Sequence, residues 1–208
     1  DPTKPVRGES SPKYSKDPIF PGVPERMHAL IPEARLIYLV RDPIERLLSH
    51  YHVIALQGWE RRNLAEALGD LSPSNRYLAP GLYAHQLEQY RAIFAADRIH
   101  VATLDALQRD PTAEMGRILE FLGLPVADAA TLDLSAHNRS APKRAVTPNG
   151  RRLQRRLGRR SLHLAGRIPG LRTVVYRPMS RPTLDPALRA RLEAFYAADQ
   201  AVLRELLA

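Results

Sequence analysis

The 208-residue sequence contains no cysteine, which excludes disulfide bonds, thiol nucleophiles and thiolate metal sites. It also has no apolar run approaching the roughly 18 residues that a membrane-spanning helix needs. No Gly/Ser linker, internal repeat or change of composition marks a second domain. We therefore predict a single domain over residues 1–208, without a membrane span, in a reducing compartment such as the cytoplasm.

One stretch of the chain has no acidic residue. Residues 138–181 hold 13 of the 31 lysines and arginines and none of the 22 aspartates and glutamates. Such a block can face an anionic ligand, a nucleic acid or simply water. A nucleic-acid-binding module is an alternative function, but the stretch lacks interleaved aromatic residues and any helix-turn-helix, KH or RRM signature. We therefore predict no nucleic-acid partner and leave the other two interpretations open.

Short apolar runs alternate with amphipathic segments, which predicts an α/β fold. Residues 1–24 are rich in proline and are expected to be irregular. Apolar runs at 35–40 and 99–104 indicate strands, the first of them buried on both faces of a parallel sheet. Residues 124–149 are expected to form a loop. Helices are expected at residues 24–31, 43–57, 64–68, 83–94, 111–122, 151–165 and from 186 to the C-terminus.

The best-marked helix directly follows the first strand. Asp42 is a good N-cap, Pro43 suits the first helical position, and apolar residues recur at helical spacing up to Gly58. Arg41 lies between strand and helix, where ligands gather in open α/β sheets, and its guanidinium can bind two oxygens of a phosphate or sulfate. Ser49, eight residues later on the polar side of the helix, can donate a hydrogen bond to the same anion.

The segment 36–51, LIYLVRDPIERLLSHY, closely resembles the 3′-phosphate-binding motif of sulfotransferases that use 3′-phosphoadenosine-5′-phosphosulfate (PAPS). Further segments resemble landmarks of the bacterial and heparan-type branch, in the family's order: residues 8–14, 81–87, 105–107, 110–111, 121–125 and 184–207. Their order and spacing make the resemblance strong. It implies a three-layer α/β/α fold with a parallel sheet, like that of P-loop NTPases, and a sulfotransferase activity.

The resemblance also implies roles for particular residues. In the family, the arginine and serine that match Arg41 and Ser49 bind the 3′-phosphate of PAPS and of its product, adenosine 3′,5′-bisphosphate (PAP). A basic C-terminal loop closes over the nucleotide in that family, so residues 138–181 are expected to form a basic cofactor-closing loop and helix. Lys143 and Arg144 are its expected cofactor contacts. No metal is expected, because no His-x-x-x-His or accompanying carboxylate pattern occurs.

The implied reaction moves a sulfuryl group from PAPS to an acceptor hydroxyl or amine, on a glycan, a lipid or a small molecule. Ser10 and Tyr14 are the expected substrate-binding residues. Ser10 stands where the heparan-type branch often has a lysine in the substrate cleft, so the identity of the acceptor stays open.

The family's opening strand and Lys-x-Gly-Thr-Thr loop, which bind the 5′-phosphosulfate, have no counterpart in this sequence. The simplest interpretation is a chain that begins after the first βα unit and also lacks the general base, so we predict no catalytic residue. We expect residues 1–208 alone to bind the cofactor weakly and to show no turnover. An inactive paralogue is one alternative. A P-loop kinase or related transferase is another, against which the Arg41–Ser49 pairing argues.

Overall fold

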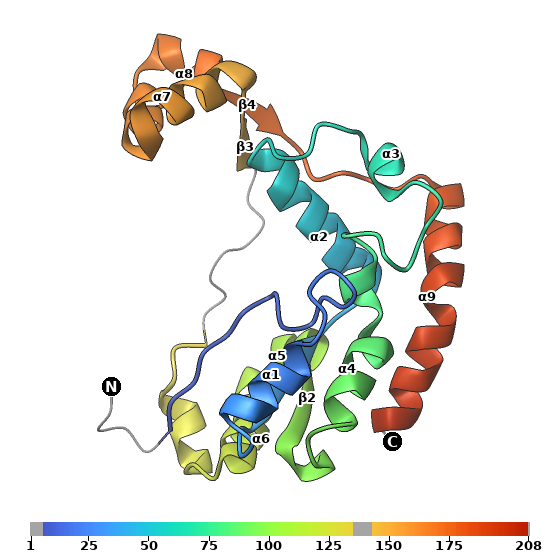
Figure 1. Ribbon diagram of the computed structural model, residues 1–208. Coiled ribbons are helices and arrows are strands. Elements are labelled where there is room, and N and C mark those ends of the chain that lie inside the picture. The colour runs from blue at the N-terminus through green and yellow to red at the C-terminus, as the bar shows by residue number, and fades with distance from the viewer. Residues whose placement is uncertain (1–5, 135–142, 208) are drawn as a thin grey trace. The chain divides into compact units, whose positions relative to one another are not determined.

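The computed structural model describes residues 6–134 and 143–207 (Figure 1). The chain divides into two compact units, each made of segments that are distant in sequence. The first unit comprises residues 1–44, 71–135 and 191–208, and the second comprises residues 45–70 and 136–190. The expectation of one domain over the whole chain stays a prediction. Among the described helices, none combines the length and the apolar character needed to cross a membrane.

The first unit is built on a pair of parallel strands. β1 (Leu36–Val40) pairs with β2 (Ile99–Thr103), in a register that runs from Leu36↔Ile99 to Val40↔Thr103. The predicted α/β fold with a parallel sheet is therefore confirmed. The prediction that β1 is buried on both faces is wrong, because Ile37 and Leu39 are 43% and 51% exposed. Successive side chains of a strand point to opposite faces, and an apolar run by itself does not say whether both faces are covered.

Two helices from distant parts of the sequence pack with this sheet in one core. They are α4 (Tyr83–Arg91) and the part of α9 (Pro186–Leu207) that belongs to the first unit. The buried residues of this core are Val40, Tyr83, Ala84, Leu87 and Leu203, and Tyr38, Ile99, Val101 and Leu206 pack against them. Asp199 of α9 also supplies the N-terminal cap of α4, since its carboxylate accepts hydrogen bonds from the backbone N–H of Ala84 (3.1 Å) and His85 (3.0 Å).

Replacing Asp199 with alanine is expected to lower the free energy of unfolding by about 1–2 kcal/mol, because two N–H groups at the start of α4 lose their acceptor. Urea denaturation followed by circular dichroism measures the change. Glu205→Ala is the matched control: Glu205 is an exposed carboxylate of the same helix, and its removal should change stability by less than about 0.5 kcal/mol. Equal losses in the two variants would contradict the capping role.

Local sequence signals place the remaining helices of the first unit well. α1 (Val23–Leu30) and α6 (Pro111–Leu122) lie within a residue or two of their predicted bounds. Asp110 caps α6 through a 3.0 Å hydrogen bond from the N–H of Ala113, and Gly123 ends it with a φ of 72°. The short helix α5 (Leu104–Arg109) was not predicted. Three 3₁₀ turns also belong to the described part of the unit: η1 (Ala79–Gly81), η2 (Ala96–Arg98) and η3 (Val126–Thr131).

The second unit contains most of α2 (Pro43–Leu56), α3 (Leu64–Leu68) and the basic C-terminal stretch. That stretch forms β3 (Lys143–Val146), α7 (Pro148–Ala165), α8 (Pro169–Val175) and β4 (Tyr176–Met179). β3 and β4 pair antiparallel, from Lys143↔Met179 to Val146↔Tyr176. Leu162, Ala165 and Val175 form a small core in this unit. The backbone of α7 is kinked at Gly158, whose φ of 82° and ψ of 175° lie outside the helical range.

The expected loop at 124–149 is corrected by the structure, because β3 lies inside it. α8 and β4 were also missed. Each strand has four residues, and each pairs with a segment about thirty residues away in sequence. Neither Lys-Arg-Ala-Val nor Tyr-Arg-Pro-Met has the alternation of polar and apolar residues that marks a half-buried strand.

Candidate nucleotide-binding site

Arg41 belongs to the first unit and is half-buried. It is the first residue after β1, and Val40, the last residue of that strand, is paired with Thr103 at the end of β2. Because the two strands are parallel, both carboxyl ends lie at one edge of the sheet, the edge at which α/β proteins bind ligands. Arg41 therefore lies where the sequence predicted, and this residue provides a cationic group at the carboxyl edge of the sheet.

Ser49 belongs to the second unit, because the boundary between the units falls inside α2, between Ile44 and Glu45. The Ser49 side chain is half-buried. Glu45 precedes it by four residues and so lies on the same side of the helix. The carboxylate of Glu45 forms a 2.6 Å ion pair with Arg181, which also donates to the Glu45 backbone carbonyl (3.2 Å).

Sequence reasoning did not single out Arg181, whose partner is 136 residues away. Its position matters because it neutralises a carboxylate one helical turn from Ser49. A bare carboxylate there would repel a phosphate. No sequence pattern could have indicated this pairing, since the contact depends on how the C-terminal stretch folds against α2.

A second arginine ties the basic stretch to the other end of α2. Nη1 of Arg151 donates to the backbone carbonyl of Gly58 at 2.9 Å. Burial and the nearby positive charges of Arg61, Arg155 and Arg177 lower the pKa of Arg151. Gly58 has a φ of 72°, and a Cβ at this position would lie 1.7 Å from Nη1 of Arg151. The glycine predicted to end the helix thus also makes room for the arginine.

Tyr51, the last residue of the resembling motif, has a structural role. Its buried ring lies on the apolar side of α2, and its hydroxyl donates to the Arg62 carbonyl at 2.7 Å. Burial raises the pKa of Tyr51, and the carboxylates of Glu60 and Glu66 raise it further. The hydroxyl therefore stays protonated and keeps the start of α3 against α2.

Lys143 and Arg144 lie in β3, so their backbone is a strand and not the loop that was predicted. They pair with Met179 and Pro178 of β4. Residues 138–142 of the expected cofactor-closing loop lie outside the described residues, as do the side chains of Lys143 and Arg144. Their role as cofactor contacts stays a prediction.

Ser10 and Tyr14 lie in the irregular segment that precedes α1 in the first unit. Ser10 is exposed and Tyr14 is half-buried. The backbone carbonyl of Tyr14 accepts a 2.7 Å hydrogen bond from the hydroxyl of Tyr90 in α4. Burial, assisted by the charge of Glu25, raises the pKa of Tyr90 to about 12, so this donor stays protonated over the ordinary pH range. The predicted substrate-binding segment is thereby attached to α4.

Gln86 attaches the same segment at a second point. It is 2% exposed, and its side chain forms three hydrogen bonds: from Asp17 N (3.0 Å), to Asp17 O (2.8 Å) and to Ala79 O (3.3 Å). Gly81, five residues earlier, is a close-approach position, where an added Cβ would come within 2.8 Å of the Tyr196 hydroxyl. Two residues of the segment 81–87, which resembles a family landmark, thus stabilise the packing of the first unit.

No group of three or more His, Asp or Glu residues that could hold a metal is found within residues 6–134 and 143–207. The structure brings Arg181 and Arg151 against α2 in the second unit, and attaches Tyr14 and Asp17 to α4 in the first. Arg41 and Ser49 keep their predicted places after β1 and on α2.

The parallel strand pair and the largely helical surroundings define a mostly helical α/β protein. The model of the Sulfotransferase family matches residues 4–128, which is more than half of the chain. The chain therefore belongs to the sulfotransferase family.

Individual relatives agree with this assignment. Human heparan sulfate glucosamine 3-O-sulfotransferase 6 is 30% identical over 106 residues, which cover 49% of this chain and 31% of the relative. The bifunctional heparan sulfate N-deacetylase/N-sulfotransferase of Drosophila melanogaster is 31% identical over 130 residues, covering 56% of this chain and 12% of the relative. The matches to the human and mouse 3-O-sulfotransferases 5 and 6 span about a third of the length of those relatives.

A solved structure supports the fold. The crystal structure of a sulfotransferase from Alicyclobacillus acidocaldarius aligns with a TM-score of 0.58 at 22% sequence identity, covering 90% of this chain and 60% of that one. The alignment extends well beyond the residues matched by the family model. The predicted sulfotransferase-type α/β fold is therefore confirmed.

Proposed function

We propose that this protein takes part in the transfer of a sulfuryl group from PAPS to an acceptor hydroxyl or amine, and that Arg41 and Ser49 bind the 3′-phosphate of the nucleotide. The observation that carries the proposal is the position of Arg41. It follows β1 at the carboxyl edge of a parallel sheet, within the part of the chain that matches the sulfotransferase family.

The chemistry of the two side chains suits a phosphate monoester. A guanidinium presents two parallel N–H donors to two phosphate oxygens, and a serine hydroxyl adds a third donor. Arg181 supports this arrangement by neutralising Glu45, four residues before Ser49 on the same side of α2. Lys143 and Arg144 are proposed as additional cationic contacts of the nucleotide.

We propose that Arg41 and Ser49 contribute by binding the nucleotide and fixing its position. In sulfuryl transfer, as in phosphoryl transfer, a protein contributes mainly by positioning the reactants and stabilising charge. The 3′-phosphate is remote from the sulfuryl group, so Arg41 and Ser49 hold the donor in register and make no contact with the bond that breaks. No residue of this chain is proposed as the general base.

We propose that the acceptor is a glycan, because the 3-O-sulfotransferases that resemble this chain are named for heparan sulfate glucosamine. Ser10 and Tyr14 are proposed to line the acceptor cleft from the segment attached to α4. A cytoplasmic location stays a prediction.

Titration of residues 1–208 with PAP and with AMP tests the 3′-phosphate assignment. PAP is expected to bind more tightly, since only PAP carries the 3′-phosphate, and isothermal titration calorimetry measures both affinities. Ser49→Ala should weaken PAP binding by about tenfold and leave AMP binding unchanged, because one hydrogen bond to a charged group is lost.

Ser161→Ala is the matched control for this titration. The hydroxyl of Ser161 donates to the Leu157 carbonyl within α7, and the variant should bind both nucleotides like the unmodified chain. Equal affinities of the unmodified chain for PAP and AMP would show that Arg41 and Ser49 do not bind a 3′-phosphate.

A further inference from the structure

The helix pair α7–α8 of the second unit carries a concentrated positive charge outside the part of the chain that matches the family, which ends at residue 128. Seven arginines of α7, α8, β4 and the segment between the helices form no ion pair with any described residue: Arg152, Arg155, Arg156, Arg160, Arg167, Arg172 and Arg177. The stretch has no carboxylate side chain of its own to offset them, because residues 138–181 include no acidic residue. A surface of this kind attracts anions.

The same two helices expose large apolar side chains. Leu157 and Leu164 of α7 are each 64% exposed. Three more apolar side chains are 45–47% exposed: Ile168 at the N-cap of α8, and Leu171 and Val174 within the helix. They recur every three residues, so they follow one side of the helix. The unit already has a core of Leu162, Ala165 and Val175, with Leu153, Val146 and Tyr176 packed against it. The exposed residues are therefore a second apolar set, which packing of the unit does not use.

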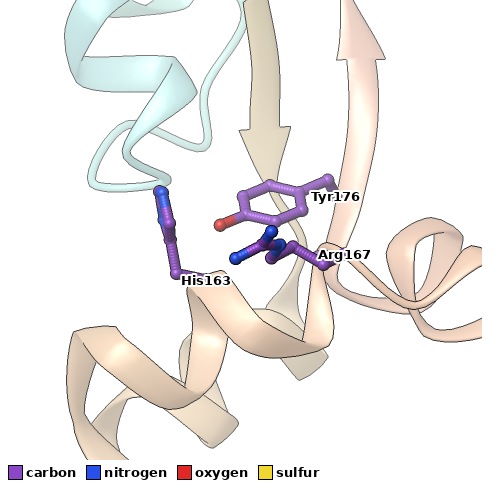
Figure 2. A pocket seen from close by; sticks show the side chains of 4 residues that line it. His163, Arg167 and Tyr176 are labelled. Carbon is purple, nitrogen blue, oxygen red and sulfur yellow. The ribbon is translucent and has the colours of Figure 1, made fainter.

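An open pocket is lined in part by residues next in sequence to Leu164 and Ile168. It has a volume of about 520 Å³ and is lined by His163, Gly166, Arg167 and Tyr176. Figure 2 shows the imidazole, the guanidinium and the phenol turned toward one space. Gly166 lets the ring approach, since a Cβ there would lie 2.5 Å from a carbon of the Tyr176 ring. Arg167 and the Tyr176 hydroxyl can donate to a phosphate group placed in the pocket.

We propose that α7 and α8 form a docking surface for a membrane that contains anionic lipids. The arginines lie at the level of the lipid headgroups, with one phosphate in the pocket beside Arg167. The exposed leucines, Ile168 and Val174 enter the boundary of the acyl chains. A basic helix with an apolar side binds in the plane of a membrane in this manner, without spanning it. The inference does not depend on the proposed sulfuryl transfer.

A lipid surface explains more of the structure than another polyanion does. A sulfated glycan or a nucleic acid would use the arginines, but it would leave five exposed apolar side chains without a role. A membrane offers anionic groups and an apolar layer within the reach of one side chain.

Sedimentation of residues 1–208 with vesicles tests the proposal. The chain is expected to bind vesicles of phosphatidylcholine with about 30% phosphatidylserine, and to bind vesicles of phosphatidylcholine alone at least about tenfold more weakly. Leu164→Gln/Leu171→Gln should weaken binding to the anionic vesicles by about tenfold or more, because two apolar side chains no longer enter the membrane. Arg155→Gln/Arg156→Gln should weaken it by roughly tenfold through the lost charge.

Matched controls come from exposed positions of the first unit. Leu30→Gln/Leu207→Gln removes two exposed leucines, and Arg109→Gln/Arg191→Gln removes two exposed arginines. Both controls should bind like the unmodified chain, and circular dichroism checks that each variant is folded. If the unmodified chain does not bind anionic vesicles, the proposal is wrong. It is also wrong if Leu164→Gln/Leu171→Gln binds normally while Arg155→Gln/Arg156→Gln does not, since that outcome indicates a site for a soluble polyanion such as dextran sulfate or DNA.

Discussion

Replacing Arg41 with alanine is expected to weaken the binding of PAP by a factor of tens to thousands. Arg41 is half-buried at the carboxyl edge of the sheet, and loss of one partner of a desolvated, bidentate charge pair, as proposed for Arg41 and the 3′-phosphate, costs about 2–5 kcal/mol. AMP has no 3′-phosphate, so its affinity should change little. Isothermal titration calorimetry with the two nucleotides measures both effects, and their difference separates loss of a phosphate contact from general damage to the site.

Two further variants sharpen this experiment. Arg41→Lys keeps the charge but not the planar pair of donors, and should therefore bind PAP with an intermediate affinity. Arg109→Ala removes an exposed arginine at the end of α5 and should leave both affinities unchanged. If Arg41→Ala weakens PAP and AMP to the same extent, Arg41 does not contact the 3′-phosphate.

Replacing Gln86 with alanine is expected to lower the free energy of unfolding by about 2–4 kcal/mol, because the Asp17 N–H, the Asp17 carbonyl and the Ala79 carbonyl lose their partner. The side chain is fully buried, so water replaces it poorly. Urea denaturation measures the change.

Gln89→Ala is the matched control for Gln86. Gln89 lies one turn later on α4, and its amide forms hydrogen bonds with the exposed His85, so the variant should lose less than about 0.5 kcal/mol. The folded fraction of Gln86→Ala should still prefer PAP to AMP, since Gln86 bonds to Asp17 and Ala79 and not to the proposed phosphate-binding residues. A loss of PAP binding without a loss of stability would mean that Gln86 acts in the site and not in the fold.

The family landmarks in this sequence divide by physical role. Gln86 forms hydrogen bonds with the N-terminal segment, and Gly81 leaves room for the side chain of Tyr196. Asp110 caps α6, and Gly123 ends that helix. These residues stabilise the fold. For Arg41 and Ser49 we propose a different role, the binding of the nucleotide.

Prediction from sequence was incomplete at two places: the exposed face of β1, and the strands β3 and β4. The run Leu36–Val40 correctly indicated a strand, but its apolar character does not reveal which face is covered, and Ile37 and Leu39 proved exposed. β3 and β4 each obtain their hydrogen bonds from a distant segment. Pairing of that kind depends on closing a long loop and leaves little signal within four residues.

The sequence by itself determined the parallel α/β character, the bounds of α1, α2, α3 and α6 to within one or two residues, and the positions of Arg41 after the strand and Ser49 on the helix. These features depend on caps, helical spacing and turn glycines, which act over a few residues. Only the tertiary structure decided that Arg181 neutralises Glu45, that Arg151 reaches Gly58, and that α7 and α8 expose leucines beside arginines. Such contacts join residues that are neighbours in space alone, so they are set by packing and charge across the fold.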